Sequence, residues 1–256
     1  ATSAMDFELT PAQQALRARA RELADGVFRE RAARWDAEEA YPWDNVKDLV
    51  RAGLMGITIP KPYGGPGGSV LDVLFVVEEI ARACGVTARI VVEGSLGVVG
   101  ALTAYGTEAQ KRRYFPWVLE DGEKPAIAIT EPEAGSAATD LVTRADEAPE
   151  GWTLGGEKRW ITGAGTSRLY LVYCRMGDRP GAEGIGGIFV ERDTPGFTVG
   201  VGLADPASVT DLADFERAAG MLGAEVVLGK VGASSRRPIH DPLRLATAYH
   251  DIFGNR

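Results

Sequence analysis

The stretch IAITEPEAGS, residues 127–136, decides the fold, because the spacing of apolar residues changes at this point of the chain. Residues 126–130 have the short, β-branched character of a strand. The strand ends at the hydroxyl of Thr130, turns at Pro132 and then exposes the backbone around Gly135 and Ser136. Such a loop can offer N–H groups and hydroxyls to the polar edge of a ligand. A proline-terminated turn that binds nothing fits the spacing equally well.

Upstream of this stretch the pattern is helical. Apolar residues recur at intervals of three, four and seven, and three segments have the form of a capping box or related helix start, at residues 10–13, 69–72 and 107–110. Asp44 is predicted to cap a further helix that ends near Gly53, and another helix is predicted over residues 90–105. Residues 57–60 precede or include a proline and are predicted to be extended. The helix that follows Ser69 is apolar nearly all round, which predicts a buried central helix.

The glycine-rich residues 63–68 raise the question of a phosphate-binding loop. The stretch matches neither GxGxxG after a strand nor GxxxxGK[ST], so a turn that joins two helices is the better interpretation. Residues 1–122 are therefore predicted to form an all-α domain.

Downstream, short segments rich in β-branched and aromatic residues follow one another, at residues 151–154, 160–162, 169–173 and 187–190. No helical stretch of ten or more residues separates them, which predicts an antiparallel sheet in a barrel or sandwich and excludes a doubly wound nucleotide-binding fold. The predicted fold class is α+β with several domains, and the first boundary lies near Gly122.

Composition excludes several classes of protein. The chain has 256 residues, with 28 Lys+Arg against 36 Asp+Glu and a formal net charge of −8, which argues against nucleic acid as a partner. The sequence has no uninterrupted run of about 18 apolar residues, so no membrane span is predicted. No signal peptide is visible either, and a cytoplasmic location is therefore expected. Two cysteines, Cys84 and Cys174, and two histidines, His240 and His250, are too few for a cysteine- or histidine-rich metal site.

A second segment, KRWITG at residues 158–163, adds a flat aromatic side chain and another hydroxyl, those of Trp160 and Thr162. A tryptophan in a strand usually belongs to the core, but it also suits stacking against a planar ring system.

Taken together, the chain resembles the acyl-CoA dehydrogenase family over residues 5–200. The resemblance is carried by DFELTPAQQALRARARELA, VRAGLMGITIPKPYGG, YGTEAQKRRYFPWVLEDGE, ITEPEAGS, GEKRWITGAG and DTPGFTVG in this order. It implies an N-terminal helical domain over residues 1–122, a middle β-barrel domain over residues 123–202, and FAD as cofactor. By the resemblance, Ile127, Ile129 and Thr130 flank the flavin ring, and Gly135 and Ser136 bond to the cofactor. Trp160 covers the ring and Thr162 reaches its polar edge.

The family's reaction is α,β-desaturation of an acyl-CoA thioester (class EC 1.3.-), in which a carboxylate base removes the α-proton and the flavin accepts a hydride. The resemblance further implies an electron-transfer flavoprotein or similar acceptor and an oligomer or a partner subunit. Residues 92–97 are similar to the segment that lines the acyl pocket, which points to Glu93, Ser95 and Leu96, together with Ser136, as substrate contacts.

The sequence departs from the family pattern locally at Glu133, Ala137 and Gly163, where Gly, Asp and Asn are common, and more broadly beyond Gly202. The Met-Gly-x-Arg-Gly stretch and the C-terminal helical bundle, which carries the catalytic glutamate, are not recognisable, so no catalytic residue is identified in this chain. Residues 203–256 contain a possible helix over 209–222, and residues 225–229 faintly resemble the Val-Leu-Gly segment at the end of the family's barrel. A structural role or a disordered terminus is the better interpretation of His240 and His250.

Three explanations of this tail stay open: a truncated or frame-altered product, a natural short subunit, and a remnant that binds without catalysis. The predicted function is FAD-dependent acyl-CoA dehydrogenation. The alternatives are a non-catalytic subunit of the same fold and a flavoprotein that performs a non-oxidative reaction on an acyl-CoA.

Overall fold

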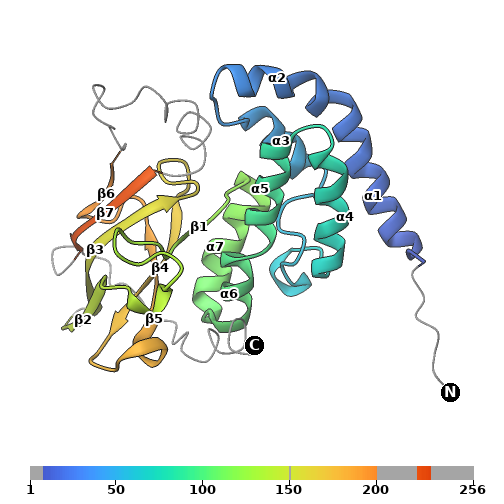
Figure 1. Cartoon of the computed structure of the whole chain (residues 1–256). Coiled ribbons are helices and arrows are strands. Elements are labelled where there is room, and N and C mark those ends of the chain that lie inside the picture. Colours follow the sequence, from blue (N-terminus) through green and yellow to red (C-terminus); the bar gives the residue numbers. More distant parts are fainter. Residues whose placement is uncertain (1–7, 150, 201–223, 232–256) are drawn as a thin grey trace. The chain divides into compact units, whose positions relative to one another are not determined.

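A computed structural model describes residues 8–149, 151–200 and 224–231, the last of these by their backbone. The chain divides into two compact units. Unit 1 comprises Ala1–Gly100 and Arg112–Gly122, and unit 2 comprises Ala101–Lys111 and Glu123–Arg256. Each unit is described by itself below, and Figure 1 labels their helices and strands.

The described residues contain seven α-helices, where the sequence predicts five. They are α1 (Pro11–Leu23), α2 (Arg29–Ala37), α3 (Trp43–Arg51), α4 (Val70–Ala81), α5 (Gly85–Ser95), α6 (Val98–Tyr105) and α7 (Glu108–Asp121). The capping boxes at Thr10 and Ser69 are both complete, and the Thr107 hydroxyl accepts the N–H of Gln110 while the Gln110 side chain accepts the N–H of Thr107. A single wide turn, Ala24–Phe28, joins α1 to α2, since Gly26 departs from helical geometry there.

Three local predictions for the helical half are wrong. Asp44 is not a cap, because α3 already begins at Trp43 after Pro42. Residues 57–60 form a turn rather than an extended segment, closed by the bond from the Ile59 N–H to the Gly56 carbonyl. The helix predicted over residues 90–105 is interrupted, because Leu96 is extended and Gly97 adopts a left-handed conformation with φ 51°.

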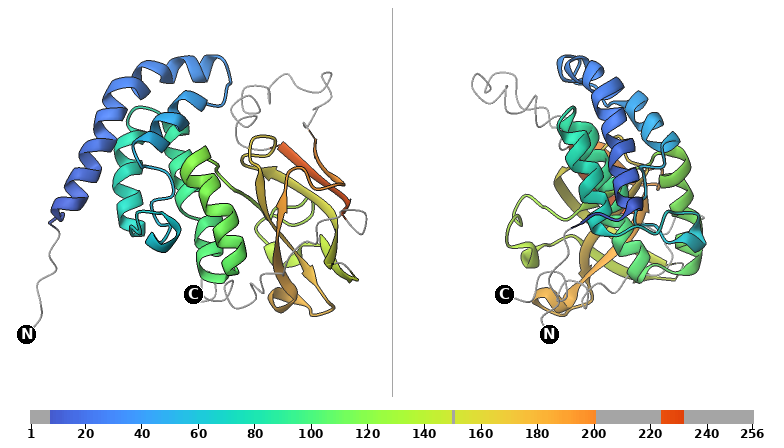
Figure 2. Two further views of the ribbon diagram at one scale, coloured as in Figure 1. Left: turned by 180° about the vertical axis from the view of Figure 1, so that it is seen from behind. Right: turned by 90° about the vertical axis from the view of Figure 1, so that its right-hand side faces the viewer.

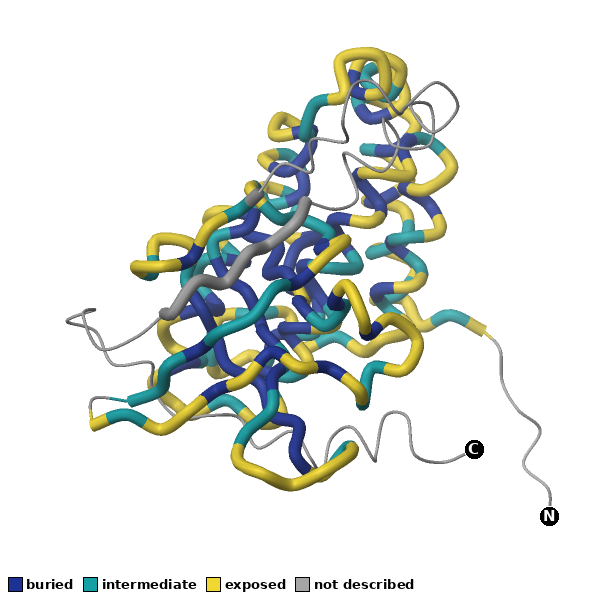
Figure 3. The backbone as a smooth tube through the Cα atoms, turned by 60° about the vertical axis from the view of Figure 1, so that its left-hand side comes forward, coloured by how far each residue is buried: buried dark blue, intermediate teal, exposed yellow. Residues whose placement is uncertain are grey.

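Helix α4 is only half as buried as its composition predicts. Val73, Val76 and Ile80 lie in the core of unit 1 with α1, α3 and α5 residues, whereas Val70, Leu71 and Leu74 are 49–56% exposed. Figure 3 shows the resulting alternation of buried and exposed segments along the helices. The prediction that the glycine-rich residues 63–68 form a turn is confirmed. They lead to the Ser69 cap, and Gly64 and Gly67 have positive φ.

The stretch Gly85–Tyr105 is long and apolar enough to cross a membrane by length and composition alone. The sequence criterion of an uninterrupted apolar run misses it because Arg89 and Glu93 lie within it. Half of its apolar window is buried in the structure, and the break at Gly97 divides it into α5 and α6. This stretch is therefore weak evidence for a span, since core helices pass the same test.

Unit 2 is built on one strongly twisted sheet of seven strands (Figures 1 and 2). These are β1 (Ala126–Ala128), β2 (Arg144–Ala148), β3 (Gly151–Ile161), β4 (Leu169–Met176), β5 (Ile185–Glu191), β6 (Phe197–Gly200) and β7 (Ala224–Val231). The sheet order is β1-β4-β2-β3-β7-β6, and β5 pairs with the other edge of β4.

The predicted helical domain followed by a β domain is confirmed, and most strand pairs are antiparallel. Two pairs are not: β1 and β2 both run parallel to β4. The crossover that brings β4 beside β1 contains the β2–β3 hairpin instead of a helix, so the absence of helices between strands did not require a purely antiparallel sheet.

The core of unit 2 lies on the inner face of this sheet and includes Leu154, Ile161, Tyr170, Val172 and Ile188. Strand β7, which contains residues 225–229, pairs with β3 and β6 and so completes the described sheet. The helix predicted over 209–222, His240 and His250 lie outside the described residues.

Candidate functional site

Strand β1 turns one apolar side chain away from the core of unit 2. Ala126 and Ala128 are buried, and Ile127 between them is 37% exposed, as the alternation of a strand requires. Ile129 and Thr130 continue the chain with intermediate exposure. The exposed side chain of Ile127 is therefore the first component of a candidate ligand-facing surface.

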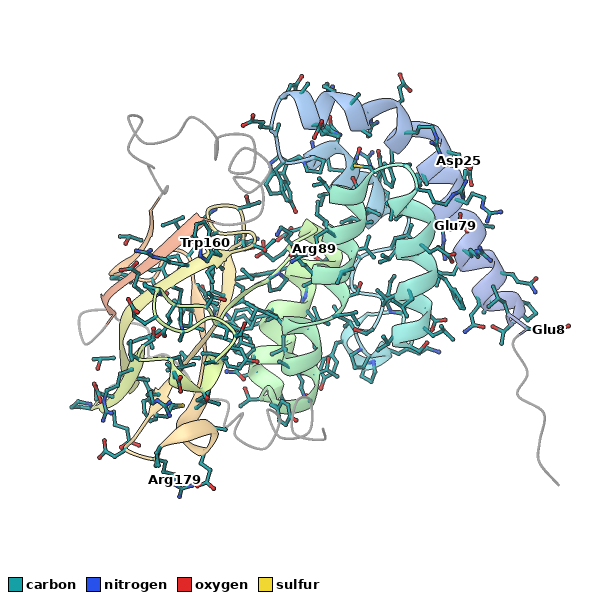
Figure 4. The ribbon with its side chains drawn as sticks, in the orientation of Figure 1. Glu8, Asp25, Glu79, Arg89, Trp160 and Arg179 are labelled. Atoms are coloured by element: carbon teal, nitrogen blue, oxygen red, sulfur yellow. The ribbon has the colours of Figure 1, made fainter. Side chains whose placement is uncertain are left out.

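Trp160 supplies the second component, from the end of β3. Its side chain is 65% exposed, and its φ of 59° places a bulky residue in the left-handed region (Figure 4). The register of β3 against β7 breaks between Lys158 and Ile161, which is where the strand accommodates this conformation. Exposed aromatic area combined with backbone strain is a feature that clusters at binding sites.

A main-chain hydrogen bond joins these two components. The Arg159 N–H donates to the Thr130 carbonyl over 2.9 Å, so the residue before Trp160 is held beside a residue that lies two positions after the end of β1. The loop then closes on itself, because Glu131 and Ala134 exchange two main-chain hydrogen bonds of 3.0 and 3.3 Å. Gly135 and Ser136 follow this closed turn and are exposed, and the space beside Gly135 is open.

A buried ion pair lies beneath this loop, and sequence reasoning missed it. Lys158 Nζ and Glu131 Oε1 are 2.7 Å apart, and the two side chains are 0% and 1% exposed. Alternation along β3 is the signal that could have found it: Leu154 faces the core, so Lys158, four residues later, faces the same side.

The two charges alter each other's protonation. Burial by itself raises the pKa of Glu131, but hydrogen bonds to the carboxylate, that of Lys158 first, outweigh burial, so the pKa lies below its ordinary value. Burial lowers the pKa of Lys158, and the Glu131 carboxylate offsets part of that effect. The Glu131 carboxylate is therefore ionised at neutral pH, 2.7 Å from Lys158 Nζ.

Thr162 and Gly163 begin the turn after β3. Thr162 has intermediate exposure, and Gly163 has a φ of 89°. A Cβ on Gly163 would meet Lys124 Nζ at 2.5 Å and Ser167 Oγ at 2.6 Å, which gives a packing reason for glycine where the family commonly has asparagine.

The predicted substrate residues belong to unit 1, apart from Ser136. Glu93 pairs with Arg89 at 2.8 Å along α5, and the fully buried Ser95 hydroxyl accepts the Ile57 N–H at 3.2 Å. Leu96 is partly buried against the core of unit 1. These contacts give the three residues structural roles, and their part in substrate binding stays a prediction.

Metal binding is not supported by the part of the chain that the structure describes, where no group of three or more His, Cys, Asp or Glu side chains could hold an ion. Cys84 and Cys174 are buried and free, and burial raises the pKa of Cys174 to about 12. The thiol of Cys174 is thus protonated at neutral pH and is a poor nucleophile.

Family models match both units. One, described as the acyl-CoA dehydrogenase N-terminal domain, matches residues 10–121, and another, the acyl-CoA dehydrogenase middle domain, matches residues 126–216. The chain belongs to the acyl-CoA dehydrogenase family. The recognition made from its motifs is thereby confirmed.

Curated relatives of this acyl-CoA dehydrogenase family member include two kinds of enzyme. A 3-sulfinopropanoyl-CoA desulfinase of Advenella mimigardefordensis is 47% identical over 74% of this chain and 47% of its own length. A short-chain specific acyl-CoA dehydrogenase of Clostridium acetobutylicum is 34% identical over 77% of this chain and 52% of its own length. The chain thus spans about half the length of the curated relatives it matches.

Solved structures share the fold. Butyryl-CoA dehydrogenase of Megasphaera elsdenii has a TM-score of 0.75 and 29% identity, with 90% of this chain and 59% of that chain covered. A glutaryl-CoA dehydrogenase of Mycobacterium smegmatis, solved in complex with FADH2, has a TM-score of 0.74 and 23% identity over 96% of this chain and 61% of that chain. The second likeness concerns the fold alone.

Proposed function

We propose that unit 2 binds FAD with the flavin ring against Ile127 and Trp160, and that the protein acts on an acyl-CoA thioester. The observation that carries the proposal is the exposed Trp160 at positive φ, tied by the Arg159–Thr130 bond to the loop that presents Gly135 and Ser136. Apolar and aromatic surface beside exposed backbone and hydroxyl groups fits a planar, polar-edged ring system.

Each residue has a distinct part in this proposal. Trp160 covers one face of the ring and excludes water from it, while Ile127 supplies apolar contact. Gly135 permits close approach of the backbone, and the Ser136 and Thr162 hydroxyls bond to polar atoms of the cofactor. When bound, the flavin supplies an acceptor for two electrons, and the protein supplies orientation.

The binding step is tested by titrating the 256-residue chain with FAD and following flavin fluorescence and absorption. We expect saturable binding, and Trp160→Ala should weaken it about fivefold to tenfold, because stacking of an aromatic side chain on a ring is worth roughly 1–1.5 kcal/mol. Trp43→Ala is the matched control, since Trp43 is a 49% exposed tryptophan of unit 1. No saturable binding, or equal effects of the two substitutions, would contradict the proposed site.

Two reactions of an acyl-CoA are candidates. The family resemblance supports α,β-desaturation, which removes an α-proton and a β-hydride and needs an electron-transfer flavoprotein or similar acceptor to regenerate the oxidised flavin. The higher identity to a desulfinase, 47% against 34% for the short-chain dehydrogenase, favours desulfination. In that reaction 3-sulfinopropanoyl-CoA and water give propanoyl-CoA and hydrogensulfite, with no net oxidation of the carbon chain and no external acceptor.

Product analysis separates the candidates. The chain with bound FAD is incubated with 3-sulfinopropanoyl-CoA and assayed for sulfite, and separately with butyryl-CoA and an artificial electron acceptor. Sulfite release without acceptor supports desulfination, while acceptor reduction with enoyl-CoA formation supports dehydrogenation. A chain that binds FAD but gives neither product is the non-catalytic subunit, and addition of a protein that supplies a C-terminal helical bundle then tests whether a partner completes the site.

A further inference from the structure

The buried side chains of Glu131 and Lys158 form hydrogen bonds to the backbone of other residues as well as to each other. Lys158 Nζ donates to the Ile129 carbonyl at 2.9 Å as well as to Glu131 Oε1 at 2.7 Å. The Glu131 carboxylate in turn accepts the Val142 N–H at 2.5 Å and the Thr143 N–H at 2.9 Å. The two side chains thus satisfy backbone groups on both sides of the loop over residues 131–143.

These contacts fix the two ends of the loop that carries Gly135 and Ser136. One end is joined to β3 by Lys158 and by the Arg159–Thr130 bond, and the other end is joined back to the first by the Glu131 carboxylate. Between these ends the loop contains the Glu131–Ala134 turn and a short turn over Ala138–Asp140, and Arg175 of β4 donates hydrogen bonds to the Thr139 and Leu141 carbonyls. The hydrogen bonds that join the first end of the loop to β3 are those of Lys158 and Arg159, so the position of the loop beside β3 depends in part on the ion pair.

The same pair adjoins the strained residue of β3. Lys158 precedes Trp160 by two residues, and Ile161, which follows Trp160, is buried in the core of unit 2. The backbone is thus anchored immediately before and after the residue with φ 59°. A conformation that costs of order 1–3 kcal/mol persists only where its surroundings over-determine it, and these two anchors do so.

Stability alone does not account for ionic side chains here. A buried ion pair is often no more stabilising than apolar residues of similar volume. An apolar pair, however, could not bond to the Ile129 carbonyl or to the N–H groups of Val142 and Thr143, and those buried or half-buried groups would lose their partners. The ionic pair is the arrangement that specifies the loop geometry.

We infer that Glu131 and Lys158 are positioning residues for the proposed flavin site: through their shared ion pair they set the spacing between the Gly135–Ser136 loop and the Trp160 strand. This inference rests on the proposed FAD site. The pair acts through Thr130, Ser136 and Trp160, in the way that residues behind a set of ligands orient the ligands themselves.

The test compares FAD affinity with fold stability in the 256-residue chain. Glu131→Gln keeps the shape and an acceptor oxygen but removes the charge, and Lys158→Arg keeps the charge on a different donor geometry. Ile188→Val is the matched control, because Ile188 is 1% exposed in β5, which pairs with the far edge of β4. Each variant is measured for its FAD dissociation constant, the shape of its bound-flavin absorption band, the flavin midpoint potential and its unfolding midpoint.

We expect Glu131→Gln to weaken FAD binding by about tenfold to a hundredfold, by analogy with partners behind metal ligands. It should also change the bound-flavin band and potential. Lys158→Arg keeps the charge but alters the donor geometry, so it should change the band while it retains more of the affinity than Glu131→Gln. Ile188→Val should lower the unfolding midpoint while the band, the potential and the affinity stay as in the unsubstituted chain.

Two results would separate the failures. If the unsubstituted chain does not bind FAD, the proposed site itself fails. If the unsubstituted chain binds FAD and Glu131→Gln leaves the affinity and the band unchanged, the proposed site stands and the positioning role is wrong. Should Glu131→Gln not fold, Lys158→Arg decides: a changed flavin band in a folded chain supports the inference, and an unchanged band contradicts it.

Discussion

Glu79 in unit 1 and Glu131 in unit 2 are carboxylates with side chains only 1% exposed, and they are neutralised in opposite ways. Glu79 lies on α4 and receives three arginines, Arg17 and Arg21 at 2.6 Å and Arg82 at 2.7 Å, each at least 36% exposed. Glu131 lies in a loop and receives one fully buried lysine and two backbone N–H groups. Figure 4 labels Glu79 on its helix.

The difference follows from whether the backbone of each segment can pair its own N–H and C=O groups. A helix satisfies its own N–H and C=O groups, so the carboxylate of Glu79 is free to join α1 to α4 through side chains. A loop next to a sheet has no such ladder, so its buried backbone groups must find side-chain partners. Exposed arginines around the buried Glu79 carboxylate therefore stabilise a helix contact in unit 1, whereas the fully buried pair of Glu131 and Lys158 specifies a loop conformation in unit 2.

The largest expected effect is that of Lys158→Met. The substitution leaves the buried Glu131 carboxylate without its cation and the Ile129 carbonyl without its donor, so we expect unit 2 to lose about 3–5 kcal/mol of stability. Hydrogen exchange of β3 amides measures it, because exchange reports each unit separately. A loss below about 1 kcal/mol, as expected for the control Ile188→Val, would show that the buried pair contributes no more than an ordinary core contact.

Glu79→Gln should cost less. The arginines around Glu79 hold its pKa at about 2, against an ordinary value of 4.5. That difference corresponds to about 3 kcal/mol, and because the arginines are exposed to water we expect about 2 kcal/mol. Exchange of α1 and α4 amides gives the measurement. A larger loss than that of Lys158→Met would reverse the comparison.

The pH dependence of this loss has a definite sign. The folded-state pKa of Glu79 is depressed, so its contribution is complete above about pH 4.5 and disappears as the pH falls through about 2. The stability difference between Glu79→Gln and the unsubstituted chain should therefore shrink to about half or less by about pH 3. A difference that is constant from neutral pH to about pH 3 would show that Glu79 packs rather than pairs.

Glycines at positive φ allow the two units to be compared through substitutions with smaller expected effects on stability. Gly53 after α3 has only the end of Arg19 within 4 Å of an added Cβ, whereas Gly163 in unit 2 has two atoms within 2.6 Å. We expect Gly163→Ala to lower the free energy of unfolding by about 2–3 kcal/mol and Gly53→Ala by about 1 kcal/mol. At Gly53 the added Cβ causes only backbone strain at positive φ, whereas at Gly163 it also clashes with neighbouring side chains. Gly177→Ala, with open space and φ 72°, is the control within unit 2. Equal losses at Gly163 and Gly177 would show that packing at Gly163 is loose.

The smallest effect is expected at the first capping box. Thr10→Ala removes the hydroxyl that accepts the Gln13 N–H, and the expected loss is about 1 kcal/mol. Thermal unfolding of α1 followed by hydrogen exchange measures it, with Thr10→Ser as the control that keeps the hydroxyl. A loss as large as that of Glu79→Gln would mean that local capping, and not the joining of α1 to α4, dominates unit 1.

Some features of the candidate site were predicted from the sequence, and others were missed. The turn before Gly135 was predicted from local chemistry, and contacts of Ile127 and Trp160 with a flavin were predicted from resemblance alone. Local pattern favoured the core for Trp160, and the structure shows its side chain 65% exposed. The Lys158–Glu131 pair was missed because it joins residues 27 positions apart, and neither residue is unusual by itself. The break between α5 and α6 was missed because no capping motif in the sequence marks the end of α5 before Gly97.

By itself the sequence determined where α1, α4 and α7 begin, where the period changes near Gly122, and which family the chain belongs to, because capping, alternation and motif order act over a few neighbouring residues. The tertiary structure alone decided that β1 and β2 run parallel to β4, that half of α4 stays exposed, and that two buried charges hold the loop beside Trp160. Those features depend on which distant segments meet, and their free energy comes from contacts that no local pattern encodes.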